Sequence, residues 1–211
     1  MKKVLLFIIT LCVVFSASAQ KKTITATVYK QFKPATILLT TGQTVNQPLA
    51  NVFLKNSSLL YMSGDNAMEA NMKNVLTVEF DDRKYIKIDS LLVYMVDSVG
   101  SDALYKATII DMVSYKSNLV NNRNITNIDL NTQLDQLSYD HIDLSNEDDY
   151  EFPLINIFYY RYNGKFIRVH ERELAKVVPK DKQRLMKTCV GQDSFSWTKE
   201  ASLLQLLKMI Q

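Results

Sequence analysis

From Lys22 to about Asn118, hydrophobic and polar residues alternate in short runs. The pattern is clear over residues 23–28, over 76–80 and over 85–88, with a polar turn at 81–83 between the last two. Alternation with a period of two, rich in β-branched and aromatic residues, is typical of half-buried strands. Short strands separated by turn signals favour a sandwich, a roll or a small barrel.

Turn-forming residues mark the ends of these runs. Proline cannot donate to a strand ladder, so we expect Pro34 and Pro48 at sheet edges or strand starts. Each of the five glycines falls at an expected turn: Gly42, Gly64, Gly100, Gly164 and Gly191.

Residues 119–151 differ from the rest, because they are rich in Asn and Asp and poor in apolar clusters. We interpret them as a polar connection with one or two short strands. A connection of this length is uncommon inside a compact domain, so it either divides two modules or carries function. The predicted organisation is thus a β-rich module over 20–118, this connection, and a third segment over 152–211.

The third segment begins with a hairpin and ends in helices. Asn163-Gly164 between two alternating runs is a strong hairpin signal. A helix is expected to begin at Glu171, Pro179 suits the first turn of another, and Ser196 is placed to cap a last helix. The predicted fold class is therefore α+β, a mostly antiparallel β roll or barrel-like sheet with a C-terminal helical segment.

A two-residue turn at Asn163-Gly164 fixes which side chains of the hairpin share a face. One face carries Phe158, Tyr160, Tyr162, Ile167 and Val169, and is predicted to be core. The other carries Tyr159, Arg161, Arg168 and His170, with Phe166 as the odd member, and is predicted to be solvated. Arginines beside aromatic rings suit carboxylates, phosphates and partner proteins, so these four residues are our candidate binding surface.

The first residues are typical of a secretory signal peptide. Lys2 and Lys3 precede an apolar run over residues 4–15, which is short for a membrane span. Ala17-Ser18-Ala19 fits the small-residue cleavage rule, so cleavage between Ala19 and Gln20 is expected. An uncleaved anchor and a lipoprotein attached at Cys12 are the alternatives. The protein is therefore expected to be exported, and periplasmic or associated with the cell surface.

Removing residues 1–19 changes the charge and the cysteine count. The chain has 25 basic and 22 acidic residues, and losing Lys2 and Lys3 lowers the net charge from +3 to 23 − 22 = +1. This balance gives no long-range attraction to nucleic acid, and no later apolar run approaches a spanning length. Cys189 then stands alone, so no internal disulfide is expected.

The sequence HEREL at residues 170–174 invites comparison with metal motifs. A zinc protease of this type needs a second histidine where Leu174 stands, so His170 is not expected to bind zinc. Cys189 is interpreted as a buried apolar residue rather than a nucleophile paired with His170. No nucleotide-binding glycine loop or nucleophile elbow is present, so we expect no catalytic residue and no cofactor.

The segment 140–151 is strongly acidic. Its carboxylates could hold calcium, which takes several oxygen ligands, although the spacing is not that of an EF-hand. The residues concerned are Asp140, Asp143, Glu147, Asp148 and Asp149, followed by Glu151. We favour a solvated acidic loop, and calcium binding and a hydrolase using these carboxylates remain alternatives.

The signal ending in Ala-x-Ala, the following Gln20 and the Lys-rich entry into β-structure resemble small exported proteins of Bacteroidetes-type bacteria. Residues 35–62 resemble compact β modules of that group. The resemblance implies location more than activity. It also implies that Ser90, in Asp89-Ser90-Leu91, and Ser98, in Asp97-Ser98-Val99, are candidate sites for O-glycosylation.

These observations favour an exported, non-enzymatic envelope protein that binds or assembles with another envelope protein. Two alternatives stay open from sequence alone: a hydrolase of an unrecognised family that uses the 140–151 loop, and a purely structural envelope protein.

Overall fold

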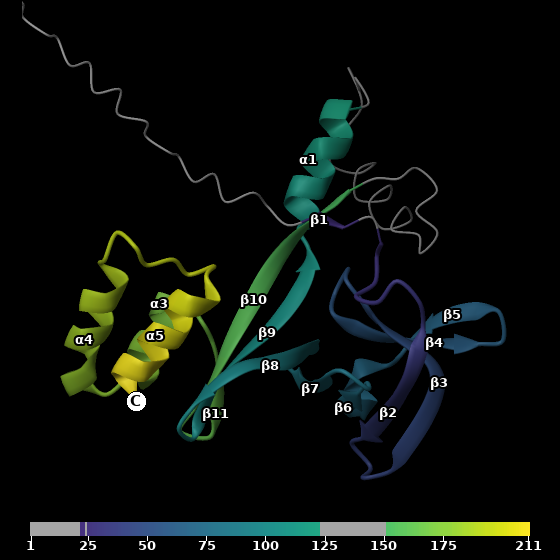
Figure 1. The fold of residues 1–211 in the computed structure, drawn as a ribbon, viewed down its shortest axis with the longest axis horizontal. Helices are drawn as coiled ribbons and strands as arrows, with labels where there is room; N and C mark the ends of the chain where they lie inside the picture. The colour runs from purple at the N-terminus through teal and green to yellow at the C-terminus, as the bar shows by residue number, and fades with distance from the viewer. Residues whose placement is uncertain (1–21, 24, 123–150) are drawn as a thin grey trace, which may run out of the picture.

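The computed structural model describes residues 22–23, 25–122 and 151–211. Their strands form one antiparallel sheet with the order β1-β10-β9-β8-β7-β6-β2-β3-β4-β5, and β11 pairs with β10 (Figure 1). The strands are β1 (Lys22–Thr23), β2 (Lys33–Leu39), β3 (Thr44–Phe53), β4 (Ser58–Ser63), β5 (Asn66–Glu69), β6 (Val75–Glu79), β7 (Lys84–Ile88), β8 (Leu91–Val99), β9 (Asp102–Ile110), β10 (Phe152–Tyr162) and β11 (Lys165–Arg168). The described helices are α1 (Met112–Asn122), α3 (Glu171–Val177), α4 (Lys180–Val190), α5 (Glu200–Ile210) and the 3₁₀ turn η1 (Met72–Asn74).

The sheet curls into a half-barrel because the β3–β4 turn returns to strands β8 and β9. The Leu92 amide donates to the Ser57 carbonyl at 2.8 Å, and the Ser57 hydroxyl donates to the Leu92 carbonyl at 2.7 Å. The Ile110 amide donates to the Leu54 carbonyl at 2.7 Å. The predicted class, α+β with a barrel-like antiparallel sheet and C-terminal helices, is confirmed.

Two apolar cores lie on the same face of the sheet. Strand register places Tyr85 opposite Tyr94, Tyr94 opposite Lys106, and Lys106 opposite Phe158. Tyr85 belongs to the half-barrel core and Phe158 to the core under the helices. We call this side of β7–β11 the inner face and the opposite side the outer face.

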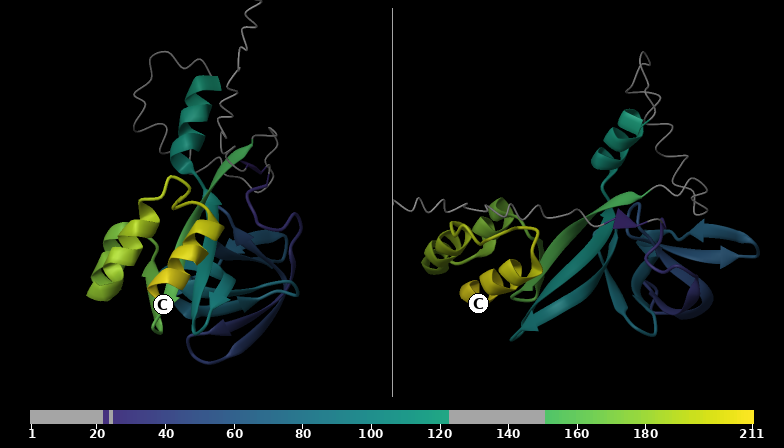
Figure 2. Two further views of the ribbon diagram at one scale, coloured as in Figure 1. Left: turned by 60° about the vertical axis from the view of Figure 1, so that its left-hand side comes forward. Right: turned by 45° about the horizontal axis from the view of Figure 1, so that its top comes forward.

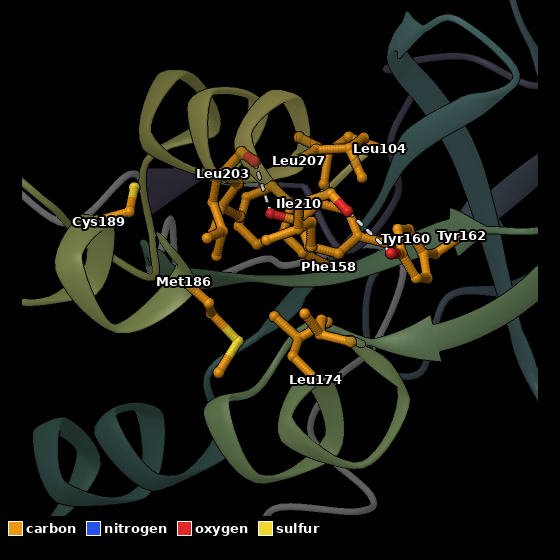
Figure 3. Close-up of a cluster of buried hydrophobic side chains, with 12 residues drawn as sticks. Leu104, Phe158, Tyr160, Tyr162, Leu174, Met186, Cys189, Leu203, Leu207 and Ile210 are labelled. Atoms are coloured by element: carbon orange, nitrogen blue, oxygen red, sulfur yellow. Dashed lines mark hydrogen bonds between the residues drawn. The ribbon is translucent and has the colours of Figure 1, made fainter. Parts of the chain in front are cut away.

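Helices α3, α4 and α5 gather at one end of the molecule, with β2–β7 at the other and α1 standing away from both (Figure 2). Under α5, two tyrosines of β10 combine apolar burial with a hydrogen bond to helix backbone (Figure 3). The Tyr160 hydroxyl donates to the Leu203 carbonyl at 2.6 Å and that of Tyr162 to the Ile210 carbonyl at 2.8 Å. Such pairing lets a buried phenol avoid the cost of an unsatisfied polar group.

The predicted strands at 76–80 and 85–88 are confirmed within one residue, but the one at 23–28 is wrong. Only Lys22–Thr23 pairs as a strand, and the chain then bends across the half-barrel. The Thr25 hydroxyl donates to the Thr27 carbonyl at 3.0 Å, and that of Thr27 to the Tyr29 carbonyl at 2.8 Å. These local bonds offer the backbone an alternative to a regular ladder.

Pro34 lies at a strand start, as predicted, but Pro48 departs from the expected position. β2 and β3 lie inside the sheet order, with Pro34 near the start of β2 and Pro48 in the middle of β3. The β2–β3 register shifts between Lys33 and Ala35, where the partners are Ala50 and Gln47. An irregularity of this kind interrupts the ladder, which explains how an interior strand tolerates the missing N–H of Pro48.

Two predicted element boundaries are also corrected. The β-rich stretch ends before Met112, because the Asp111 carboxylate accepts from the amides of Val113 and Ser114 and so supports the start of α1. Ser196 does not cap the last helix, which begins at Glu200 with Lys199 as its N-cap. The Ser196 hydroxyl lies 2.9 Å from that of Thr198 instead.

Candidate functional site

The hairpin that carries the candidate binding residues has the predicted register. Tyr162 pairs with Lys165, Tyr160 with Ile167, and Tyr159 with Arg168. Asn163 and Gly164 both have positive φ, 49° and 76°, as a tight two-residue turn requires. The five residues predicted as core all lie in or against the core under the helices, which confirms that half of the prediction.

Substituting Gly164 with Ala is expected to destabilise the protein by roughly 1–2 kcal/mol, because a side chain at positive φ is strained. An added Cβ meets nothing within 4 Å, so steric collision makes no contribution. Urea unfolding measures the effect, with Lys165→Ala in the same turn as the control. Equal stability of the Gly164 variant and wild type would contradict the assignment of the turn.

Register across four strands defines the centre of the outer face. Arg168 lies opposite Tyr159, Tyr159 opposite Tyr105, and Tyr105 opposite Met95. Phe166 lies opposite Arg161 on the same side. The outer face therefore combines aromatic, aliphatic and basic side chains from β8, β9, β10 and β11.

Tyr159 is not solvated as the sequence predicted. It is 4% exposed and packs in a cluster of the outer face with Val93, Ala103 and Tyr105. Its hydroxyl donates to the Asp89 carboxylate at 3.1 Å. Burial is the larger cause that raises the pKa of Tyr159, and the nearby Asp89 carboxylate adds to it. Small alanine neighbours on β9 leave room for the ring to lie against the sheet, which sequence alternation alone did not indicate.

Arg161 and Arg168 are accessible, as predicted. The Arg161 guanidinium donates to the Ser101 carbonyl at 3.0 Å, and Arg168 is exposed. Among the described residues, neither arginine has a carboxylate within 4.0 Å. Two guanidinium groups are thus available for an external carboxylate.

Two apolar side chains lie between and beside the arginines: Phe166, which the sequence already placed on this face, and Met95, which it did not indicate. Phe166 is 43% exposed and Met95 is 52% exposed. The rings of Phe166 and Tyr105 meet edge to face with centroids 5.4 Å apart, which holds Phe166 in place. Met95 and Tyr105 belong to strands whose pairing with the hairpin depends on long-range register, so no local signal pointed to them.

His170 has a structural role at the start of α3. It is the N-cap residue, and its Nδ1 accepts from the Arg172 amide at 3.2 Å. It lines a shallow hollow with Trp197, which packs against the core under the helices. His170 therefore has a local partner in the backbone of α3.

The other sequence candidates divide into buried, exposed and undescribed residues. Cys189 is fully buried in the core under the helices, and burial raises the pKa of its thiol, which disfavours a nucleophilic thiolate. Ser90 and Ser98 are exposed. Glu151 binds the Lys22 ammonium at 2.7 Å.

The five candidate calcium ligands lie outside the described residues, as do the signal segment and its cleavage site at Ala19 and Gln20. Within 22–23, 25–122 and 151–211, no three His, Cys, Asp or Glu side chains gather in a way that could hold a metal ion. None of the helices described there has the length and apolar composition needed to cross a bilayer.

Comparisons with protein-family models, with curated proteins and with solved structures found no match to the chain. The function must therefore be inferred from the chemistry of the described surface.

Proposed function

We propose that this chain is an exported, non-enzymatic protein of the cell envelope, periplasmic or surface-associated, whose outer face binds an acidic partner protein. The proposal of export rests on the signal-like sequence of residues 1–19. The proposal of binding rests on one observation: Arg161 and Arg168, without carboxylate partners in the described chain, flank the exposed ring of Phe166.

This arrangement suits protein recognition for two physical reasons. Aromatic residues, Met and Arg are enriched at the buried centres of protein interfaces, and Phe166, Met95 and Arg161 supply all three types. A guanidinium also binds a carboxylate through two parallel hydrogen bonds, which gives orientation as well as attraction. An acidic partner with an apolar segment therefore complements the outer face.

The test is retention of a partner from an envelope extract by the purified protein. We expect an acidic protein that wild type retains to bind about tenfold more weakly to the Arg161→Glu, Arg168→Glu double variant, because two attractive charges become repulsive. Retention should also weaken as salt rises. The matched control is Lys180→Glu with Lys187→Glu, which makes the same charge change on exposed positions of α4.

A protein retained equally by the double arginine variant and the lysine control would overturn the outer-face assignment. Replacing Phe166 by Ala separates apolar contact from charge. It should weaken retention without changing its salt dependence, since Phe166 carries no charge.

A further inference from the structure

A second feature lies on the inner face of the sheet, away from the proposed partner surface. It is a hollow of about 180 Å³ inside the half-barrel, between the segment after β1 and the strands β7–β9. Its lining combines apolar residues with hydroxyls and one cation: Thr23, Thr27, Val28, Val52, Leu54, Ser57, Arg83, Tyr85, Tyr94, Thr108 and Leu154.

Arg83 is the charged group of this hollow. Its guanidinium carbon lies 4.2 Å from the centre of the Tyr94 ring, and its Nη1 donates to the Tyr85 hydroxyl at 3.5 Å. In the described part of the chain no carboxylate lies within 4.0 Å of it. A guanidinium remains protonated at any ordinary pH, so a positive charge faces the hollow without a counter-ion there.

The acidic residues next to Arg83 in sequence, Asp81 and Asp82, pair with other side chains. Lys33 donates to the carboxylates of Asp81 and Asp82, both at 2.6 Å, and the Tyr29 hydroxyl donates to Asp82 at 2.9 Å. Burial alone would raise the pKa of Asp82, but the hydrogen bonds from Lys33 and Tyr29 outweigh it and lower that pKa. Asp82 is therefore ionised and paired, and it does not neutralise Arg83.

Three hydroxyl groups of the lining already donate their protons to the protein. Ser57 donates to Leu92, Thr27 to Tyr29, and Thr108 to the side chain of Asn156. Arg83 is the one cation among the lining residues. The lining also includes four aliphatic side chains, those of Val28, Val52, Leu54 and Leu154. The hollow thus combines one cation with hydrocarbon.

We propose that this hollow binds a short organic acid, with its carboxylate on the Arg83 guanidinium and its hydrocarbon part against Val52 and Leu54. The planar fork of arginine matches a carboxylate, and stacking on Tyr94 fixes the plane of that fork. The volume is below the 300–1,000 Å³ usual for drug-sized ligands, so an acid of only a few carbon atoms is expected. The site is independent of the proposed partner surface.

Butyrate is the probe, and backbone amide shifts of Ser57, Tyr94 and Thr108 report binding in the hollow. We expect saturable shifts with a dissociation constant of about 1 mM, reasonable for six non-hydrogen atoms. Substituting Arg83 with Met should abolish them, and Arg83→Lys should weaken binding about tenfold because the bidentate contact is lost. Arg184→Met makes the same change on an exposed position of α4 and should bind butyrate as wild type does.

1-Butanol has a similar hydrocarbon chain without charge, and inorganic phosphate has charge without hydrocarbon. Equal binding of 1-butanol and butyrate, unchanged binding by Arg83→Lys, or no shifts in the hollow would each overturn the proposal. Phosphate binding as tight as that of butyrate would show the carboxylate assignment to be wrong. If Arg83→Met does not fold, Arg83→Lys alone tests the site: binding of butyrate about tenfold weaker than wild type supports the proposal, and unchanged binding overturns it.

Discussion

Substituting Leu207 with Ala is expected to lower the free energy of unfolding by about 2–5 kcal/mol. Leu207 is fully buried in α5, in the core that joins this helix to β9 and β10 (Figure 3). Truncation removes buried methyl groups and leaves a cavity that the surrounding Leu203, Leu206 and Tyr160 can fill only in part. Urea denaturation followed by circular dichroism measures the change.

Leu185 in α4 provides the matched control. It undergoes the same chemical change but is 46% exposed, so Leu185→Ala should alter stability far less. Similar losses for Leu207→Ala and Leu185→Ala would mean that α5 is not packed on the sheet as described.

The second large effect is expected where α5 meets the inner face. Lys106 of β9 is 9% exposed, and its ammonium lies 2.5 Å from the Glu200 carboxylate at the start of α5. Substituting Glu200 with Gln leaves the buried ammonium without its counter-charge. We expect a loss of roughly 1–2 kcal/mol, below the 3–5 kcal/mol of a fully buried pair because the Glu200 side chain is 40% exposed.

This pair also predicts a pH dependence. Burial alone would lower the pKa of Lys106, but the hydrogen bonds to Glu200 and Tyr94 outweigh it and raise that pKa above its ordinary value. A raised lysine pKa gives stability that is complete below the unfolded value of about 10.4 and is lost as pH rises through the folded value. The stability difference between wild type and Glu200→Gln should therefore be constant near neutral pH. It should shrink as the pH rises through the pKa of Lys106 in the folded protein.

Denaturation at a series of alkaline pH values tests this expectation. Glu173 pairs with Lys176 on the exposed side of α3, so Glu173→Gln should leave both stability and its pH dependence unchanged. A difference for Glu200→Gln that grows with rising pH would contradict the assigned role of Lys106.

The parts of the structure predicted correctly are those that local chemistry determines. Asn163-Gly164 fixes a two-residue turn, and the turn fixes which side chains of β10 and β11 lie opposite each other. For the same reason the five core residues of the hairpin were identified. The helix at Glu171 was predicted because its acidic first turn and its amphipathic pattern are local features as well.

The parts that were missed depend on distant residues. Whether Tyr159 is buried depends on the alanines of β9 and on Asp89, 70 positions away in the chain. The hollow around Arg83 exists only because the segment after β1 crosses strands far along the sequence. Ser196 has a side chain suited to capping a helix. In the structure its backbone amide donates to the hydroxyl of Ser202, and the helix does not begin at Ser196.

The pairing of β1 with β10 has a consequence for the order of folding. Lys22 lies opposite Pro153, and its ammonium contacts Glu151, which is 129 positions later in the chain. During synthesis the first strand emerges long before its neighbour exists, so its backbone hydrogen bonds must wait for β10. Until then the start of the folded part stays accessible to whatever machinery handles the nascent polypeptide.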